Sequence, residues 1–206
     1  MRSRKILSIM ALATFAMHAH AQQLGLPVGI DAAPMDAGSL VASTAIVLSD
    51  DVNTYGGGAL FNITESIAVS GDVGLIDFSG LNMGFALQGG GMYRLPDFPD
   101  VPIDFAVRGA LGYATVSDDT DVDITSIAVM GLASYTIDDM FSVYGILGLA
   151  HARAKFSFGR FSVTETETEP AIGVGGLFTF MPEASVFAEI MHIDDTFFGF
   201  GGKFAF

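Results

Sequence analysis

The chain ends in the residues Phe197-Phe198-Gly199-Phe200-Gly201-Gly202-Lys203-Phe204-Ala205-Phe206. Successive side chains of a β-strand point to opposite faces of the sheet, so every second residue shares a face. One face of this stretch carries Phe198, Phe200, Phe204 and Phe206. The other face is mostly small and includes the charged Lys203. The pattern predicts a terminal strand whose aromatic face must be covered, either by a second protein layer or by lipid.

The amino-terminus has the three-part plan of a secretory signal peptide. Basic residues at positions 2, 4 and 5 precede an apolar run over 6–17, and Ala19-His20-Ala21 offers small residues for cleavage. The run is too short for a stable membrane-spanning helix, which needs about 20 residues. We therefore predict a signal peptide over 1–21, in preference to a buried amino-terminal helix.

Composition excludes several classes of function. The formal net charge is −14, which disfavours nucleic acid because its phosphates require a basic face. Cysteine is absent, so the chain has neither disulfides nor thiolate metal sites. Half of the residues are nonetheless hydrophobic. Acidic loops between apolar strands would reconcile the charge with this hydrophobic content.

The chain after position 37 reads as a single series of strands. After an irregular periplasmic lead-in over 22–37, alternating segments separated by turn residues cover 38–49, 54–63, 66–78, 81–94, 102–117, 122–136, 141–157, 161–180, 185–193 and 196–206. No segment has the length of a membrane-spanning helix. In a membrane, only a closed barrel satisfies the hydrogen bonds of strand backbones. We predict an all-β, closed antiparallel up-and-down transmembrane β-barrel over 38–206, with about ten strands and eight as the alternative.

The two faces of the predicted strands differ in size and charge. Large apolar residues alternate with small or ionisable ones, and the signal peptide and terminal phenylalanine assign the large face to lipid. The residues expected to point outward are Phe85, Phe105, Val107, Leu111, Phe178, Phe198 and Phe200. Those expected to point into the lumen include Gln88, Asp104, Arg108 and Lys203.

Charged residues of the small face form the candidate functional cluster. The lumen ion-pair candidates are Asp72, Asp104, Arg108, Glu189 and Lys203. An isolated charge in a narrow lumen loses hydration that only a partner or ordered water replaces. We therefore expect Arg108 to lie within ion-pairing reach of Asp72, Asp104 or Glu189, in a structural rather than a catalytic role.

The sequence suggests no catalytic residue, cofactor or metal site. His151 and His192 are the only histidines that remain after signal-peptide removal, and no Gly-x-Ser-x-Gly motif accompanies them. The acids of 118–123 alternate as in a calcium loop. They lack its glycine, however, and Met130 stands where the closing glutamate of an EF-hand would be.

The hairpin between the segments 141–157 and 161–180 offers a register to predict. Three basic residues alternate on the first strand and three glutamates on the second. With a turn centred on Arg160, the expected pairs are Lys155–Glu165, Arg153–Glu167 and His151–Glu169. Cross-strand pairs of opposite charge would then set the register. These basic residues share their strand face with Leu147 and Leu149, so we expect the ladder to stand above the membrane rather than to follow a bulge.

The alternating, phenylalanine-terminated last strand resembles the closing strand of bacterial outer-membrane β-barrels. The chain as a whole resembles the small OmpA/OmpX/opacity-type barrels in architecture. The resemblance implies that Phe204 and Phe206 act as the signal read by the barrel-insertion machinery. It also implies the outer membrane of a Gram-negative-type bacterium as location, with outer-membrane lipid and lipopolysaccharide as partners. The expected role is structural or at the cell surface, without turnover. The alternatives are a narrow transport pore and a lipid-modifying enzyme.

Overall fold

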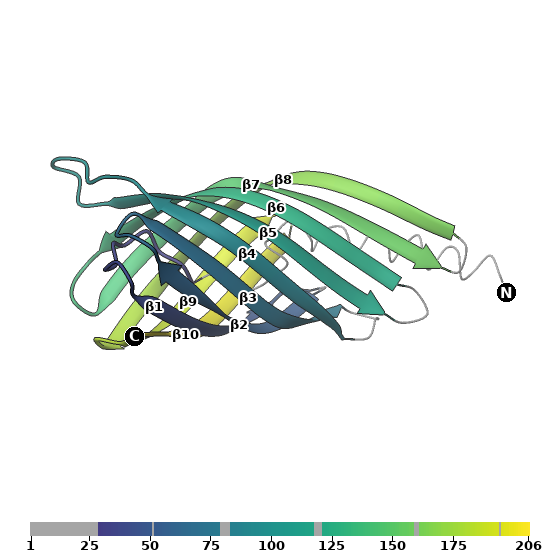
Figure 1. The fold of residues 1–206 in the computed structure, drawn as a ribbon, viewed down its shortest axis with the longest axis horizontal. Helices are drawn as coiled ribbons and strands as arrows, with labels where there is room; N and C mark the ends of the chain where they lie inside the picture. The colour runs from purple at the N-terminus through teal and green to yellow at the C-terminus, as the bar shows by residue number, and fades with distance from the viewer. Residues whose placement is uncertain (1–28, 51, 79–82, 118–120, 159–160, 194) are drawn as a thin grey trace.

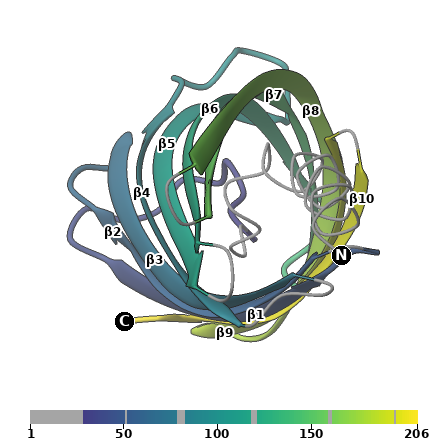
Figure 2. The same ribbon diagram turned by 90° about the vertical axis from the view of Figure 1, so that its right-hand side faces the viewer.

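The computed structural model describes residues 29–206 except 51, 79–82, 118–120, 159–160 and 194. The predicted signal peptide, the first part of the predicted lead-in and most connections at one end of the strands lie outside these residues. The described chain forms one closed barrel (Figures 1 and 2). Its strands are β1 (Leu40–Leu48), β2 (Val52–Asn62), β3 (Ile67–Phe78), β4 (Gly84–Arg94), β5 (Asp104–Ser117), β6 (Asp121–Thr136), β7 (Phe141–Phe158), β8 (Phe161–Met181), β9 (Ala184–Ile193) and β10 (Asp195–Ala205).

Every strand pairs antiparallel with its neighbours in the chain, and β1 closes the barrel against β10. The closing register runs from Val41 opposite Ala205 to Leu48 opposite Phe198. The described residues thus confirm a barrel of ten strands, and the alternative of eight is wrong. Within the same residues, no helix is long and apolar enough to cross a membrane.

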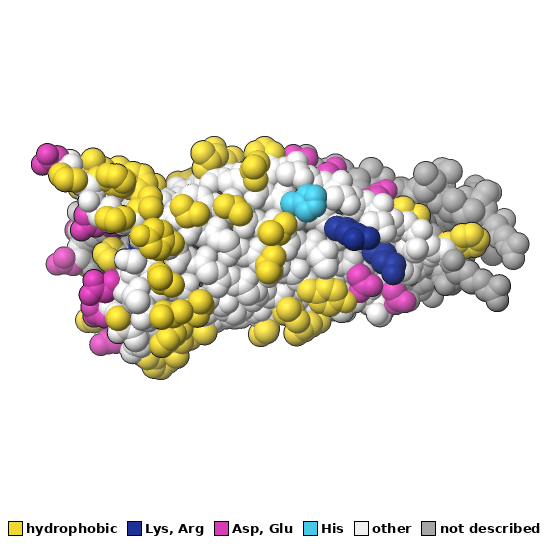
Figure 3. All heavy atoms as spheres, turned by 45° about the horizontal axis from the view of Figure 1, so that its top comes forward, with side chains coloured by type: hydrophobic (Ala, Val, Ile, Leu, Met, Phe, Trp, Pro, Cys, Tyr) yellow, Lys and Arg dark blue, Asp and Glu magenta, His cyan; other side chains and the backbone are white. Residues whose placement is uncertain are grey.

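The outer wall is apolar, as the alternation predicted. Exposed large side chains include Phe85, Val107, Leu111, Phe198 and Phe200, with Leu111 63% exposed. Phe105 and Phe178 also point outward and are half-buried, since each packs against a neighbouring ring, Phe98 and Phe141 respectively. Figure 3 shows hydrophobic side chains spread over one side of this wall. No second protein layer covers the described outer face, so the large apolar face is available to lipid.

The strands define two ends of the barrel. The carboxy-terminal end holds Phe206 and the turns 63–66, 95–103, 137–140 and 182–183, and we use this name for it below. The opposite end holds the other connections and the tip of the β7–β8 hairpin. This hairpin extends beyond the other strands there (Figure 1), because β7 and β8 have 18 and 21 residues.

The predicted register of the β7–β8 hairpin is wrong by one residue. Lys155 lies opposite Thr164, Arg153 opposite Thr166 and His151 opposite Thr168. The glutamates lie opposite alanines instead: Glu165, Glu167 and Glu169 face Ala154, Ala152 and Ala150. A slip of one residue exchanges strand faces, so the basic and acidic side chains point to opposite sides of the wall.

The length of the connection explains this difference. A turn centred on Arg160 needs three residues outside the ladder, whereas Phe158 pairs with Phe161 and leaves only positions 159 and 160 between the strands. Two-residue connections are the commonest in hairpins because their twist matches that of the strands. The observed register also keeps the basic residues on the outward face of Leu147 and Leu149 without a bulge.

The outward face of β5 provides a test of membrane contact. Replacement Leu111→Arg places a charge on the wall midway along β5, and we expect it to lower the free energy of unfolding by about 2–4 kcal/mol. Urea unfolding of the protein in lipid vesicles measures this. The control is Ile137→Arg, at an exposed position in a turn of the carboxy-terminal end, with an expected cost of about 0–1 kcal/mol. Equal costs at the two positions would contradict lipid contact at Leu111.

Candidate functional site in the barrel lumen

A buried polar cluster lines the lumen side of β3, β4 and β5. Arg108 of β5 is 2% exposed, and its Nη2 lies 3.7 Å from Oδ2 of Asp72 on β3. The same Nη2 donates to Oγ of Ser70 at 3.2 Å. Gln88 of β4, directly opposite Asp72 in the ladder, donates from Nε2 to Asp72 Oδ2 at 3.4 Å. We call these four residues the Arg108 cluster; they tie three neighbouring strands together across the inside of the wall.

Two other lumen candidates, Glu189 and Asp104, lie outside the Arg108 cluster. Glu189 of β9 is buried and accepts a hydrogen bond from the Tyr144 hydroxyl at 2.9 Å. Asp104 lies four residues from Arg108 on the same strand, a separation of about 13 Å at the rise of a β-strand. The two side chains share the lumen face but are too far apart along β5 to pair.

Glycines on the lumen face make room for these large polar side chains. A methyl group added to Gly58 would collide with the carboxylate of Asp72, and one added to Gly175 would collide with the ring of Tyr144. Both glycines lie in strands, where glycine weakens the element and marks a close approach. Glycines in these strands therefore leave the space that the large polar side chains need inside the barrel.

The lead-in segment enters the lumen, which the sequence did not predict. We call the described part of it, residues 29–37, the inner segment. Lys203 of β10 donates from Nζ to the carbonyl oxygen of Gly29 at 2.6 Å and forms an ion pair with Asp31 at 3.3 Å. The Gly29 amide donates to Glu189 at 3.3 Å, and the Ala32 amide donates to Oγ of Ser134 at 2.7 Å. Two predicted lumen charges, Lys203 and Glu189, thus hold backbone groups of the inner segment.

The backbone at Gly29 requires glycine for two reasons. Its φ of +41° lies in the left-handed region, which residues with a side chain rarely adopt. A Cβ at this position would also overlap the ring of Phe187, which is buried on β9. Only a glycine lets the inner segment come this close to the wall, although nothing in the local sequence marked that contact.

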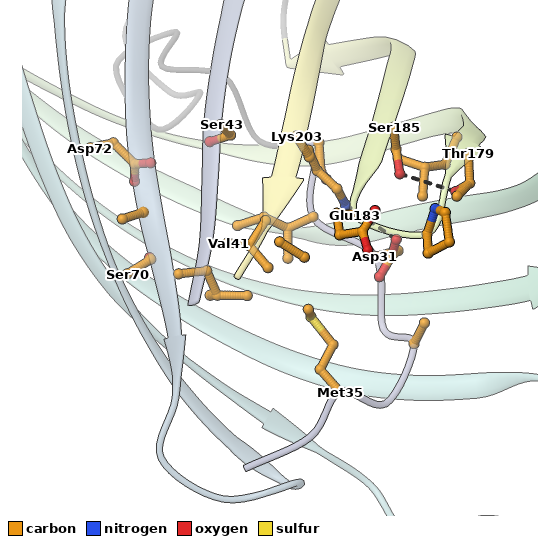
Figure 4. Close-up of a pocket in the computed structure, with 18 of the residues that line it drawn as sticks. Asp31, Met35, Val41, Ser43, Ser70, Asp72, Thr179, Glu183, Ser185 and Lys203 are labelled. Atoms are coloured by element: carbon orange, nitrogen blue, oxygen red, sulfur yellow. Dashed lines mark hydrogen bonds and ion pairs between the residues drawn. The ribbon is translucent and has the colours of Figure 1, made fainter. Parts of the chain in front are cut away.

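A cavity of about 190 Å³ lies between the inner segment and the barrel wall at the carboxy-terminal end (Figure 4). Charged groups of both signs line it: Asp31, Asp72, Arg94, Glu183 and Lys203. Hydroxyl groups of Ser43, Ser70, Thr179 and Ser185 add further polar atoms. Arg94 is itself buried and donates from Nη1 to Asn62 Oδ1 at 2.8 Å, so it also fastens β4 to the end of β2.

The two histidines among the described residues lie outside the lumen. His151 and His192 are exposed on the outer wall, and each bonds through Nδ1 to a threonine hydroxyl, that of Thr168 at 2.7 Å and that of Thr196 at 3.2 Å. Among the described residues, no three His, Asp or Glu side chains come together as metal ligands would.

The proposed insertion signal lies at the seam where the barrel closes. Phe204 and Phe206 are both exposed, and their ring centroids are 4.9 Å apart. The Phe206 amide donates to the Leu40 carbonyl oxygen at 2.8 Å, so the last residue still pairs with the first strand.

Comparison with known proteins agrees with this architecture. The family model for the outer membrane protein beta-barrel domain matches residues 7–203. The chain belongs to this family. No curated protein matches it significantly in sequence.

The chain is similar to solved structures of other barrels at low sequence identity. The outer membrane protease OmpT from Escherichia coli is 9% identical, with a TM-score of 0.52 over 82% of this chain and 94% of OmpT, and this likeness shows the fold alone. The amino-terminal barrel of Pseudomonas aeruginosa OprF is 14% identical, with a TM-score of 0.42 over 84% of this chain and 100% of that one. Ail of Yersinia pestis is 19% identical, with a TM-score of 0.40 over 84% of this chain and 100% of that one.

The Arg108 cluster yields a stability prediction. Replacement Arg108→Ala leaves the carboxylate of Asp72 buried beside a neutral site, and we expect it to lower the free energy of unfolding by about 3–5 kcal/mol. Urea unfolding in detergent micelles, followed by heat-modifiable gel migration, measures the change. An unfolding midpoint equal to that of the wild-type protein would contradict a structural ion pair.

The matched control for this prediction removes both charges. We expect Arg108→Met combined with Asp72→Asn to recover most of the lost stability, because no buried charge then lacks a partner. If the double variant is as unstable as the sum of the single variants Arg108→Met and Asp72→Asn, the two residues do not interact.

Proposed function

We propose that this protein is an integral outer-membrane β-barrel with a structural or surface role, a closed lumen and no turnover. The observation that carries the proposal is that the lumen is occupied. The Arg108 cluster lines one wall, Tyr144 and Glu189 enter from another, and the inner segment is bound inside the barrel near the carboxy-terminal end.

The buried charges and the inner segment in the lumen support a static rather than a conducting lumen. An ion that passed along the lumen side of β3–β5 would have to separate Arg108 from Asp72 or displace their neighbours. Either step leaves a desolvated charge, which is costly in a confined interior. The inner segment adds hydrogen bonds to β6, β9 and β10, so its removal leaves the partners of several strands unsatisfied.

The family and the even number of strands give the proposal its orientation. With an even number of antiparallel strands both chain ends lie at one end of the barrel, which in outer-membrane barrels is the periplasmic end. The carboxy-terminal end of this barrel would then face the periplasm, and the β7–β8 tip would project outward. In this orientation Phe204 and Phe206 lie at the periplasmic rim, which suits their proposed role as the insertion signal.

Conductance across a planar bilayer tests the proposal. The wild-type protein, once heat-modifiable migration shows that it is folded and inserted, should give no steady current above that of the bare bilayer. A stable ohmic current from the wild-type protein would overturn a closed lumen.

A narrow transport pore is the second candidate, and the polar cavity beneath the inner segment favours it. A pore needs this segment to leave, and Lys203 is one of the side chains that hold its backbone. We therefore compare Gly29→Val and Lys203→Met, which disturb the segment, with Leu111→Ala on the outer wall. A closed structural barrel stays silent in all three, whereas a gated pore conducts in the first two only.

A lipid-modifying enzyme has less support in this geometry. Each histidine bonds to a threonine on the outer wall rather than to a serine or an acid in the lumen. Mass profiles of lipid A from cells with and without the protein test this alternative. A protein-dependent change in acylation or headgroup mass would contradict a role without turnover.

A further inference from the structure

Three exposed basic side chains lie in a row on one part of the outer wall. Arg94 and Arg108 are buried and Lys203 points inward, whereas His151, Arg153 and Lys155 are all exposed on the outward face of β7. Figure 3 shows a histidine and Lys or Arg side chains in a row on one side of the barrel, near the end opposite the carboxy-terminus. We call these three residues the basic row. In a chain with a net charge of −14, such a row is a local exception.

The basic row begins where the apolar band of the wall ends. Leu147 and Leu149 precede it on β7 and are 66% and 59% exposed. Val129 lies beside Leu149 on β6, and Ile172 lies beside Leu147 on β8. Two residues along a strand tilted by about 45° rise about 5 Å, so Arg153 and Lys155 stand about 5 and 10 Å above the level of His151. That is the height of the headgroup layer.

The neighbours of the basic row are polar and mostly uncharged. On β8, Thr164, Thr166 and Thr168 lie opposite the three basic residues. On β6, Asp123 lies opposite Lys155 and Thr125 opposite Arg153. Asp123 accepts a hydrogen bond from the Tyr113 hydroxyl at 2.7 Å. The three glutamates of β8 point to the other face of the wall. On the outward face of β6, Asp123 lies directly opposite Lys155, and Asp121 lies one outward position further, opposite Ser157.

We propose that the basic row and its flanking threonines bind phosphate groups of the lipid in the outer leaflet. Arg153 and Lys155 supply charge, and the threonine hydroxyls donate hydrogen bonds to phosphate oxygens. The apolar band directly below contacts the acyl chains of the same lipid. This combination of contacts favours a phosphorylated amphiphile over a free anion. The inference rests on the proposed membrane orientation, since it requires the β7–β8 tip to lie in the outer leaflet.

Protein folded into phosphatidylcholine vesicles, with or without diphosphoryl lipid A, tests the inference. A ligand that binds only the folded protein raises the urea concentration at the unfolding midpoint in proportion to occupancy, so a titration with lipid A gives an apparent affinity. For Arg153→Gln combined with Lys155→Gln we expect an affinity roughly thirtyfold weaker, because each charge near an anionic surface contributes about fivefold. High salt should weaken binding by the wild-type protein. Equal lipid A stabilisation of the wild-type and double variant would overturn the proposal.

Three controls make the result specific. Asp123→Asn removes the acid beside the row and should tighten binding; a change in the same direction as the double variant would contradict an electrostatic site. Arg153→Lys combined with Lys155→Arg keeps both charges and should bind within a few-fold of the wild-type protein. Inorganic phosphate added to plain phosphatidylcholine vesicles should not shift the midpoint, and a shift equal to that from lipid A would replace the lipid site with a free-anion site.

The test separates this inference from the proposed function. Heat-modifiable migration of each variant shows whether the barrel is folded and inserted before lipid A is added. Conductance depends on the lumen, and the basic row lies on the outer wall. A current from the wild-type protein would therefore end the closed-lumen proposal while leaving the lipid titration valid.

Discussion

The fold depends on one constraint: a strand in hydrocarbon cannot leave its backbone amides and carbonyls unpaired. The pairing of β1 with β10 meets this constraint by removing both edges of the sheet, from Val41 opposite Ala205 to Leu48 opposite Phe198. Once the sheet is closed, alternation divides its residues into a lipid-facing set and a lumen-facing set. The aromatic face of the last strand is then an outer surface, and Lys203 is obliged to point inside. The other features of the molecule follow from which residues this division places against lipid and which it places in the lumen.

The lumen shows how a small barrel builds an interior without a conventional apolar core. Arg108, Asp72 and Gln88 satisfy one another across neighbouring strands, and the close glycine beside Asp72 provides the space they need. Near the carboxy-terminal end, Lys203 and Glu189 bind backbone groups that come from a different part of the chain. Charge in this interior is therefore used twice, first to join strands and then to hold an irregular segment against them.

Much of this could be predicted from the sequence, because period-two alternation reports directly on the faces of a strand. The ten segments, the outward phenylalanines and the lumen position of Arg108 follow from that single pattern. The register of the β7–β8 hairpin could not be predicted in the same way, since the charge pattern favoured a three-residue turn whereas only two residues separate the strands. The position of the inner segment could not be predicted from the sequence either. Asp31 lies in an irregular stretch with no periodicity, and its partner Lys203 is 172 residues away, so only the closed three-dimensional structure brings them together.

The contacts of the inner segment also constrain the order in which the barrel can assemble. Its partners Glu189 and Lys203 belong to the last two strands, so these contacts join residues 160 to 174 positions apart in the chain. Contacts of such sequence separation form late, because the entropy of closing a long loop must be overcome first. Both partners reach the lumen face only when β9 and β10 have joined the sheet, so the segment cannot complete these contacts before the last strands are in place. Docking of the segment is therefore expected to accompany or follow the sealing of the seam, as a slow event at the end of folding.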